Sequence, residues 1–346
     1  MARLAPPAFA RFANDLDADL RAALPLDERL PGLYDMLRYH LGWLDEHLVP
    51  TPGPTGKRLR PVLCLLAAEA MGGDYRRALP GASAVEIVHN FSLVHDDIED
   101  NSPERRHRPT VWRLWGVPQG VNAGDVLFAL AFECLGRLRD LGHPPDVVLT
   151  SLRLLSLTCR RLCEGQYLDI SFESRSDVSE EEYYEMVAGK TGALLAYSAQ
   201  LGALLGSGSL QTAEPLRRFG FELGLAFQIQ DDILGIWGDE SRTGKPRGDD
   251  LRQRKKTLPL IYALTKAKGH FLTALKTIVE GRGLASPQQV ADAEEALEAA
   301  GAREYAEQRA SEHLGKAIDE LQTLTSANAA IGELRSLAEY LIGREA

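Results

Sequence analysis

Two acidic clusters contain the residues of this 346-residue chain whose types and spacing best suit chemistry. The first is the run HDDIED at 95–100, which ends an apolar helical pattern. At about 100° per residue, Asp96 and Asp100 would lie one turn apart on one helix face, with Asp97 beside them. Such carboxylates repel one another by about 2–3 kcal/mol per pair at ~6 Å and an effective dielectric of ~20. The cluster therefore predicts either a Mg²⁺ site, since Mg²⁺ prefers hard oxygen ligands, or a solvated acidic helix end.

The second cluster is the run FQIQDD at 227–232, and it too ends an apolar helical pattern. Its Asp231-Asp232 pair lies about 135 residues after the first cluster, and Asp239 follows it. One Asp-Asp pair is a weak signal, but two pairs that both end apolar helices are much less expected by chance. They indicate two acidic walls that face one cavity, with metal ions between them.

Basic clusters alternate with the acidic ones along the chain. Each of them alone fits a solvated surface patch, but metal ions clamped between carboxylates need an anion, and Arg and Lys bind phosphate oxygens. The first basic cluster opens the helical pattern 58–72, where the helix dipole and the free N–H groups also favour an anion. The alternation therefore indicates a site for one or two diphosphates bridged by Mg²⁺. The basic clusters are GKRLRP (56–61), Arg105-Arg106, Lys190-Thr191, TGK (243–245) and RKKT (254–257).

Composition argues against several other classes of protein. The chain has 39 Lys and Arg against 49 Asp and Glu, a net charge of −10, whereas binding to nucleic acid relies on excess basic residues. The four cysteines form no CxxC pair and are too few for a disulfide framework, so we expect a reduced, cytoplasmic protein. Residues 1–15 have no apolar core of a signal peptide. The uncharged stretch 191–213 contains Gln, Ser and Gly, and we expect a buried helix there rather than a membrane span.

Helices must position these residues. Apolar residues recur at three- and four-residue spacing in ten segments, and alternating β-branched runs are absent. Ser179 with Glu182 predicts a capping box, and Ser286-Pro287 predicts a helix start. Residues 284–322 are expected to form an outer, solvated helical pair. The expected fold is all-α, with ten or more helices that include 33–48, 58–72, 82–97, 119–138, 145–171, 181–206, 213–237, 255–278, 287–300 and 302–322.

In order and spacing, these motifs resemble those of the trans-isoprenyl diphosphate synthases, the family of farnesyl and geranylgeranyl diphosphate synthases. The resemblance covers residues 50–265, approximately, with family-like helices outside that range. It implies one all-α domain over residues 1–346, built around a deep apolar cavity, and a homodimer as the usual assembly. The matching pieces are GKRLRP (56–61), HNFSLVHDDIED (89–100), RRHRPT (105–110), GDVLF (124–128), EGQYLD (164–169), KTG (190–192), FQIQDD (227–232) and GKPRGDDLRQRKKTLP (244–259).

The resemblance also implies how three Mg²⁺ ions and two diphosphates would be bound. Asp96 and Asp100 would bind two of the ions, with support from Asp97. Asp231 would bind the third, with Asp232 behind it. The allylic diphosphate would be bound by Arg105, Lys190, Gln228 and Lys245, and isopentenyl diphosphate by Lys57, Arg60, His89 and Arg106.

The implied reaction is a head-to-tail (1′-4) condensation. Loss of pyrophosphate leaves an allylic cation, which needs an apolar, water-poor pocket and which Thr191 would stabilise. Mg²⁺ and lysines would stabilise the leaving group, and Lys255 would close over the site. The double bond of isopentenyl diphosphate attacks the cation, and the released pyrophosphate is the expected base. His95 is the alternative base, but its neighbouring carboxylates favour a supporting role. Gln166 and Asp169 are expected in the cavity wall.

Three positions depart from the family pattern. The second motif commonly reads DDxxD, but Gly235 stands where its third carboxylate would be. His107 stands where the family often has glycine after the arginine pair. Arg254 replaces a glycine before the lysine, and we expect it to add charge at the mouth of the site.

Product length is expected to depend on what lies beneath the first acidic motif. Ser92 lies one turn before Asp96 and leaves room for a growing tail, while Phe91 would form a partial floor. An aromatic residue five positions before the motif, with no insertion inside it, resembles geranylgeranyl diphosphate synthases of the archaeal type. We therefore expect a C20 product, with C15 farnesyl diphosphate as the alternative. A terpene cyclase and a non-catalytic regulatory subunit are further alternatives.

Overall fold

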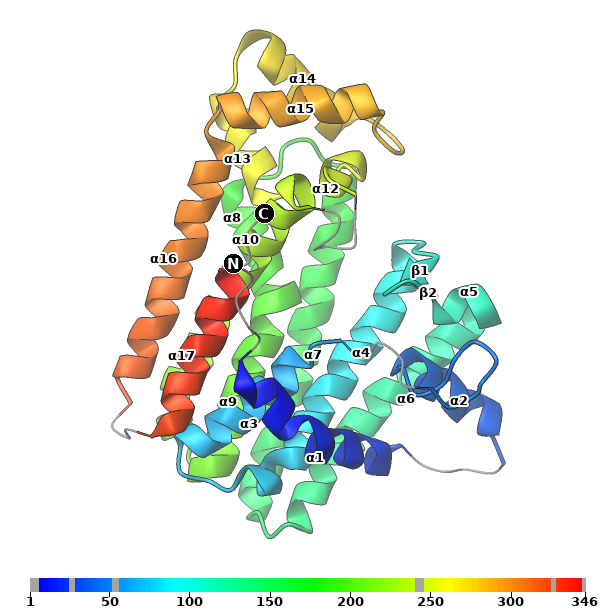
Figure 1. Cartoon of the computed structure of the whole chain (residues 1–346), viewed down its shortest axis with the longest axis vertical. Helices are drawn as coiled ribbons and strands as arrows, with labels where there is room; N and C mark the ends of the chain where they lie inside the picture. Colours follow the sequence, from blue (N-terminus) through cyan, green and yellow to red (C-terminus); the bar gives the residue numbers. More distant parts are fainter. Residues whose placement is uncertain (1–5, 25–28, 52–55, 240–245, 325–327, 344–346) are drawn as a thin grey trace.

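The computed structural model of the chain describes residues 6–24, 29–51, 56–239, 246–324 and 328–343. Nearly all of this is helix (Figure 1), which confirms the expected all-α class. The α-helices are α1 (Pro7–Ala23), α2 (Pro31–His40), α3 (Leu59–Ala70), α4 (Leu79–Glu99), α5 (Val111–Trp115), α6 (Val117–Gly136), α7 (Pro145–Glu173), α8 (Glu180–Val187), α9 (Ala193–Ser207), α10 (Leu210–Trp237), α12 (Asp249–Arg252), α13 (Leu258–Lys266), α14 (Gly269–Glu280), α15 (Pro287–Ala299), α16 (Ala302–Gln322) and α17 (Ala329–Ile342). Shorter elements are the 3-10 turns η1 (Tyr75–Ala78) and η2 (Arg137–Arg139), the π-helix η3 (Ala188–Gly192), and strands β1 (Glu104–Arg105) and β2 (Arg108–Pro109).

Helix α9 lies at the centre of the packing. All of its residues from Leu194 to Leu205 are buried, against α3, α4, α7 and α10. Glycines allow the helices to approach closely, because a Cβ at Gly202 would come within 3.0 Å of the Cys64 carbonyl in α3. The uncharged stretch of sequence is therefore a core helix, as expected. Within the described ranges, no helix is both long and apolar enough to cross a membrane.

The long helices α4, α7 and α10 each pack against α9. Figure 1 shows α4, α7 and α10 along the long axis of the molecule, with α14 and α15 across one end. Helix α16 lies along α10 and buries a face of alanines, among them Ala302, Ala306 and Ala310. Residues 284–322 were expected to form an outer, solvated helical pair. In this pair, α16 exposes only one of its faces to solvent and packs the other against the protein. The acidic ends of α4 and α10 are carried on this frame.

Both predicted helix starts are present. Ser179 and Glu182 form a reciprocal capping box at the start of α8. Ser286 caps α15, where Pro287 is the first helical residue and Gln289 completes a second capping box. Each satisfies backbone N–H groups that a helix start otherwise leaves without partners.

Several predicted boundaries were wrong. The helix expected over 33–48 ends at His40, because Gly42 adopts a left-handed conformation (φ 80°) and the Trp43 N–H bonds back to the Arg38 carbonyl. This is a glycine stop signal. The helix expected over 255–278 is two helices, since the backbone is extended at Ala267 and Lys268 before α14 begins at Gly269.

Two further features of the structure were not predicted from the helical pattern of the sequence. The pattern 181–206 is interrupted by the π-helix η3. A two-stranded antiparallel hairpin follows α4, although no strand was expected. Its strands have only two residues each, too few for an alternating pattern to be recognised in the sequence.

Candidate active site

The first acidic group lies at the C-terminal end of α4. Asp96 and Asp100 are one turn apart on one face, as the spacing predicted. Burial raises the pKa of Asp96 to about 6, the negative charge of Asp100 adds to this, and Lys190 and Arg105 oppose it. Asp97 is buried and points elsewhere, because its Oδ1 accepts a hydrogen bond from Arg105 Nε at 2.7 Å. Asp97 therefore orients the arginine, while Asp96 and Asp100 form the acidic face.

The hairpin that follows α4 presents the arginine pair. Its turn consists of Arg106 and His107, both in the left-handed region at φ 53° and 61°. Two-residue hairpin turns need such values, which glycine adopts at little cost. This explains why glycine suits position 107 and why His107 is strained there. The turn directs the Arg106 guanidinium onto the backbone of Gly56, where a Cβ would lie 2.6 Å from Nη2.

The predicted isopentenyl diphosphate residues are brought together beneath this hairpin. Arg60 at the start of α3 lies 3.2 Å from His89 of α4, Nη1 to Nε2. Burial and the positive charge of Arg60 lower the pKa of His89 well below its usual value, so this ring is neutral. Burial also lowers the pKa values of Arg60 and Arg106. Lys57 lies at the exposed edge, with its Nζ 5.7 Å from the ring centre of Tyr340.

Three polar residues that the sequence analysis missed lie behind this basic group. Glu86 is only 3 % exposed, and its Oε1 accepts a hydrogen bond from Asn90 Nδ2 at 3.1 Å. Burial raises the pKa of Glu86, while Arg58 and Arg60 oppose this. His40 also contacts Asn90, and burial lowers its pKa to about 3. Glu86 and Asn90 could have been noticed as polar residues inside an apolar helical pattern, whereas His40 gave no signal.

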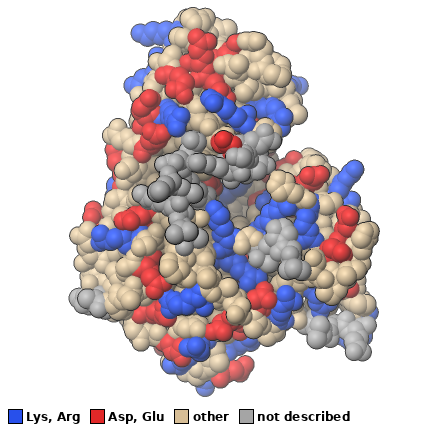
Figure 2. All heavy atoms as spheres, in the orientation of Figure 1, with Lys and Arg blue, Asp and Glu red and all other residues tan. Residues whose placement is uncertain are grey.

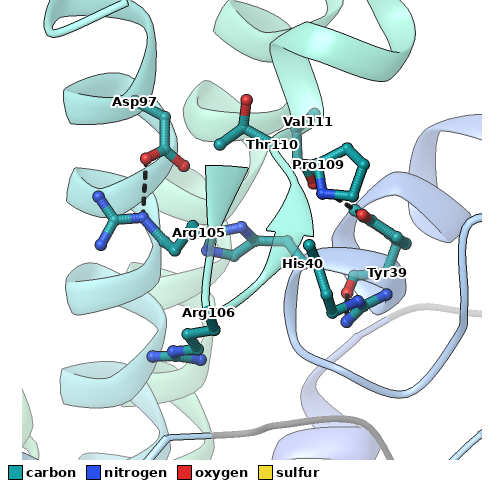
Figure 3. A pocket seen from close by; sticks show the side chains of 9 residues that line it. Tyr39, His40, Asp97, Arg105, Arg106, Pro109, Thr110 and Val111 are labelled. Carbon is teal, nitrogen blue, oxygen red and sulfur yellow. Dashed lines mark hydrogen bonds and ion pairs between the residues drawn. The ribbon is translucent and has the colours of Figure 1, made fainter. Parts of the chain in front are cut away.

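Figure 3 shows the small pocket in which His40 lies, between α2, the end of α4 and the hairpin. It is lined by Tyr39, His40, Asp97, Arg105, Arg106, Arg108, Pro109, Thr110 and Val111. Arg105 and Asp97 face each other across one side, and the His40 ring lies between the two arginines of the hairpin. On the face drawn in Figure 2, Lys and Arg side chains lie in and beside the hollow at the centre of the molecule. Basic side chains therefore surround the site, whose carboxylates lie at the ends of α4 and α10.

The π-helix η3 connects the two acidic groups. Lys190 pairs with Asp169 of α7, and its charge also interacts with Asp96. The next residue, Thr191, donates a hydrogen bond to Gln228 Oε1 of α10 at 2.7 Å. The wide π turn fits between α7 and α10 because glycines meet there: a Cβ at Gly165 would come within 3.0 Å of the Lys190 backbone. π turns are frequent at functional sites.

The second acidic group ends α10. Asp232 is buried, and its Oδ2 accepts hydrogen bonds from Tyr183 Oη at 2.7 Å and from the Leu258 N–H at 3.0 Å. Its Oδ1 accepts one from Gln228 at 3.0 Å. Burial and the charge of Asp250 raise the pKa of Asp232 to about 7. Asp231 is half-buried and near enough to Arg60 to raise the pKa of that arginine, against the larger lowering by burial.

The wall residues on α7 have specific partners. Asp169 pairs with Lys190, and Gln166 Nε2 donates to Glu99 Oε2 at 2.8 Å. Gln166 and Asp169 therefore link α7 to the end of α4 and to η3. Lys255 is exposed, and its charge reaches Glu173 at the end of α7. Lys245 lies outside the described residues.

The expectation for Arg254 was wrong. Its Nε donates to the Gly283 carbonyl at 2.7 Å, and its Nη1 donates to the Thr277 and Ile278 carbonyls at 2.6 and 2.9 Å. Arg254 therefore binds the carbonyl end of α14, where a cation is favoured, and does not add charge at the mouth of the site.

The residues that precede the first acidic group in α4 divide between two faces of the helix. His95 turns toward α6, where its Nε2 lies 3.3 Å from the Val121 carbonyl, which favours a supporting role over that of a base. Phe91 shares this face and packs edge-on against Phe128 of α6, with ring centres 5.3 Å apart. Ser92 lies on the Asp96 face and is half-buried. Ser92 is thus better placed than Phe91 to face a tail below Asp96.

The donor set fits a magnesium ion. Carboxylate oxygens such as those of Asp96, Asp100 and Asp231 are the ligands that Mg²⁺ prefers. In the described part of the chain, no three His, Cys, Asp or Glu side chains converge closely enough to hold a metal ion. A cation here would therefore share its coordination with phosphate oxygens and water, as Mg²⁺ commonly does.

Comparison with known proteins agrees with this geometry. Residues 42–299 match the model of the polyprenyl synthetase family. A (2E,6E)-farnesyl diphosphate synthase of Mycobacterium tuberculosis is 43% identical over 318 residues, which cover 91% of this chain and 87% of that protein. A geranylgeranyl diphosphate synthase of the same species is 41% identical over 323 residues, covering 89% and 91%. The two identities are nearly equal, so overall sequence similarity does not distinguish a farnesyl from a geranylgeranyl diphosphate product.

Solved structures share the whole fold. The polyprenyl synthetase of Streptomyces coelicolor A3(2) superposes with a TM-score of 0.89 at 38% identity, covering 97% of this chain and 98% of that one. A geranylgeranyl pyrophosphate synthase of Corynebacterium glutamicum, complexed with isoprenyl diphosphate and magnesium, has a TM-score of 0.80 at 29% identity, covering 98% of both chains. The arrangement of the helices and the matched sequence together establish that this chain is a member of the polyprenyl synthetase family.

Proposed function

We propose that the protein condenses isopentenyl diphosphate with allylic diphosphates, head to tail, to form geranylgeranyl diphosphate and pyrophosphate. The observation that supports this most is the pairing of two different anion environments. One is the Arg60, His89 and Arg106 group, in which burial lowers the pKa values of both arginines and of the histidine. The other lies between the carboxylates that end α4 and α10. Two diphosphates of different roles need two such environments.

In this proposal three Mg²⁺ ions bind between the acidic groups and the allylic diphosphate. Asp96 and Asp100 hold two of them, and Asp231 holds the third. When bound, the ions supply Lewis-acid stabilisation of the departing pyrophosphate and a template for its orientation. Asp97 holds Arg105 toward the same diphosphate, and hydrogen bonds from three directions hold Asp232 behind Asp231.

The remaining roles follow from the contacts. Lys190 supplies charge to the allylic diphosphate, together with Arg105, Gln228 and Lys245. The Thr191 hydroxyl donates to Gln228 and keeps its lone pairs for the developing cation. Neutral His89 donates a hydrogen bond to isopentenyl diphosphate without adding charge, while Lys57, Arg60 and Arg106 neutralise it. Lys255 approaches from the exposed side. The departing pyrophosphate accepts the proton that is lost after carbon–carbon bond formation.

A product assay tests this function. The purified chain is incubated with Mg²⁺, isopentenyl diphosphate and, separately, dimethylallyl, geranyl and farnesyl diphosphates, and product length is measured after dephosphorylation. We expect C20. A C15 product would favour farnesyl diphosphate synthase, a cyclic hydrocarbon would indicate a terpene cyclase, and no product from any primer would indicate a regulatory subunit.

Ser92 sets the expected product length. Ser92→Phe places a ring one turn below Asp96, where it should block the tail and shift the product from C20 toward C15 or shorter. Ser92→Ala is the matched control, because it keeps the space open and should leave the product at C20. An unchanged product from the Ser92→Phe variant would contradict this account of chain length.

We also propose that one domain of the chain acts in a cytoplasmic homodimer. The cytoplasmic location is supported by four cysteines that are all unpaired. The dimer is supported by large apolar side chains that are exposed on adjoining helices, and their burial against a second copy is measurable by sedimentation. They are Leu114, Val117, Val121 and Phe128 of α5 and α6, and Leu149, Leu157, Tyr167 and Ile170 of α7.

A further inference from the structure

Helix α1 contacts the segment that carries part of the isopentenyl diphosphate group, although this helix contains none of the motifs found in the sequence. Oδ1 of Asp17 in α1 accepts a hydrogen bond from Arg58 Nη2 at 2.7 Å. Arg58 lies between Lys57 and Arg60 and directly precedes α3. Its side chain is only 13% exposed. The ion pair therefore ties α1 to the start of α3, and hydrogen bonds between two charged groups are among the stronger ones.

The Asp17 carboxylate is held by two further side chains. Its Oδ1 also accepts a hydrogen bond from Trp43 Nε1 at 3.3 Å, and its Oδ2 accepts one from Arg21 Nε at 2.7 Å. The Arg21 guanidinium in turn lies over the Trp43 ring, 4.4 Å from the ring centre. Burial acts to raise the pKa of Asp17, but the hydrogen bonds and charges of Arg58 and Arg21 lower it below its usual value. Asp17 is therefore an ionised and oriented anchor.

The backbone of Arg58 adopts a conformation that other contacts must stabilise. Arg58 is left-handed, at φ 48° and ψ 40°, and this region is unfavourable for a residue with a Cβ. Residues in such regions persist where the surrounding structure holds them. The Arg58 carbonyl also accepts a hydrogen bond from the Val62 N–H at 3.2 Å. The conformation of Arg58 therefore sets the direction in which α3 begins.

Residues on both sides of Arg58 contact the isopentenyl diphosphate group. Two residues later, Arg60 Nη1 lies 3.2 Å from His89 Nε2. The Nε of Arg60 is buried and has no hydrogen-bond partner in the described part of the chain. Two residues earlier, the backbone of Gly56 packs against the Arg106 guanidinium. A shift at Arg58 would therefore displace both arginines of this group.

We infer that Asp17 is a positioning residue for isopentenyl diphosphate: through Arg58, it holds the segment 56–60 in the conformation that binds this substrate. None of the described partners of Asp17 belongs to the allylic diphosphate group. Helix α1 should therefore affect the affinity for one substrate and not for the other. The inference rests on the proposed function, since it assigns a residue to one of its two substrate sites.

Steady-state kinetics on the full chain tests the inference, with isopentenyl and geranyl diphosphates varied in turn. We expect Asp17→Asn to raise KM for isopentenyl diphosphate by about fivefold to tenfold, because binding groups are misplaced. KM for geranyl diphosphate and kcat should stay close to their wild-type values. Asp17→Glu keeps the carboxylate and should recover most of the affinity. An unchanged KM for isopentenyl diphosphate in Asp17→Asn would overturn the inference.

Asp19→Asn is the matched control for loosening of α1. Asp19 lies on the same helix and accepts hydrogen bonds from Arg137 and from Ser83, each at 2.6 Å. Neither partner belongs to the segment 56–60. Asp19→Asn should therefore lower the melting temperature as much as Asp17→Asn does, but leave KM for isopentenyl diphosphate unchanged. An equal rise of KM in both variants would show that only the general packing of α1 matters, and would overturn the inference.

A double-variant cycle tests whether Asp17 acts through Arg58. Arg58→Gln should raise KM for isopentenyl diphosphate about as much as Asp17→Asn, and the double variant should be no worse than either, since residues in contact are not additive. Additive effects would show that the two residues act separately. A lower KM in Asp17→Asn would also contradict the inference, because Asp17 would then only mask the charge of Arg58.

The product assay on wild type keeps this inference separate from the proposed function. Prenyl product from wild type, together with unaltered KM values in Asp17→Asn, would refute the role of Asp17 and leave the proposed function standing. Absence of any prenyl product from wild type would refute the proposed function itself, and the inference with it.

Discussion

The two acidic ends of the site are built in different ways. At the end of α4, Asp96, Asp97 and Asp100 lie within five consecutive residues. Arg105, which contacts Asp97, comes from the hairpin that follows. At the end of α10, Asp232 is held by side chains or backbone from α8, α10 and α13, and Asp250 arrives from α12. The first end is therefore specified by local spacing, and the second by tertiary packing. Substitutions at the end of α4 should therefore lower kcat by removing charge from the substrate site. Substitutions at the end of α10 should act by displacing the carboxylates that packing holds in place.

The largest effect is expected at the first end. Asp96→Asn removes a charge from the face that meets the allylic diphosphate, so kcat should fall by about 10²–10³-fold, the range seen when one electrostatic contact to developing charge is removed. Asp97→Asn loses only the contact that orients Arg105, so its fall in kcat should be about tenfold smaller than that of Asp96→Asn. Steady-state kinetics with geranyl diphosphate compares the two variants. Equal losses would show that the two aspartates do not have separate roles.

At the second end, Tyr183→Phe removes one hydrogen bond to buried Asp232. Asp232 Oδ2 keeps its hydrogen bond from the Leu258 N–H, and one hydrogen bond contributes about 0.5–1.5 kcal/mol net. The free energy of unfolding should therefore fall by that amount, while kcat falls less than in Asp96→Asn. Chemical denaturation and the product assay report the two quantities. Tyr184→Phe, at the adjacent and more exposed position, is the control. A Tyr183→Phe protein of wild-type stability would argue against positioning through Asp232.

The pH dependence of stability offers a third comparison. In the metal-free protein the pKa of Asp232 is about 7, above its unfolded value near 3.8. Between these values the folded state binds the extra proton, so stability is highest at low pH and falls as pH rises toward 7, by about 1.4 kcal/mol per pH unit for a fully retained proton. Asp232→Asn should flatten this slope. Thermal melts from pH 4 to 7 measure it, and an unchanged slope would exclude Asp232 as its source.

The smallest effect is expected at the hairpin. His107→Gly relieves a left-handed residue whose conformation costs about 1–2 kcal/mol for a residue with a Cβ, partly offset by the greater freedom of glycine when unfolded. The free energy of unfolding should rise by about 0.5–1 kcal/mol. Activity should stay within twofold, because the Arg106 guanidinium keeps its place against Gly56. A thermal melt checks the first expectation, and loss of stability would contradict the turn assignment.

Much of the fold and of the first acidic end could be predicted from the sequence. Helical spacing placed Asp96 and Asp100 on one face, and ordinary capping residues marked the starts of α8 and α15. Arg254 was misjudged because its partners are carbonyls of α14, which no local pattern connects to it. The close approach of the Asp250 carboxylate to Gly235 was missed for the same reason. Glu86 could have been recognised, since a carboxylate inside an apolar helical face needs a compensating partner.

The π-helix η3 restricts how the chain can change length. Its extra residue sets where Lys190 and Thr191 point, and it also sets the register of α9, whose Gly202 must meet the Cys64 carbonyl. A one-residue deletion inside 188–192 would turn the π turn into an ordinary α turn and change the directions of Lys190 and Thr191. A one-residue insertion into the regular helix that follows would rotate the later part of α9 by about 100° and bring a side chain to the Gly202 contact. Natural length variation in this family should therefore fall in connections such as 174–178 and spare the segment from 188 to 202.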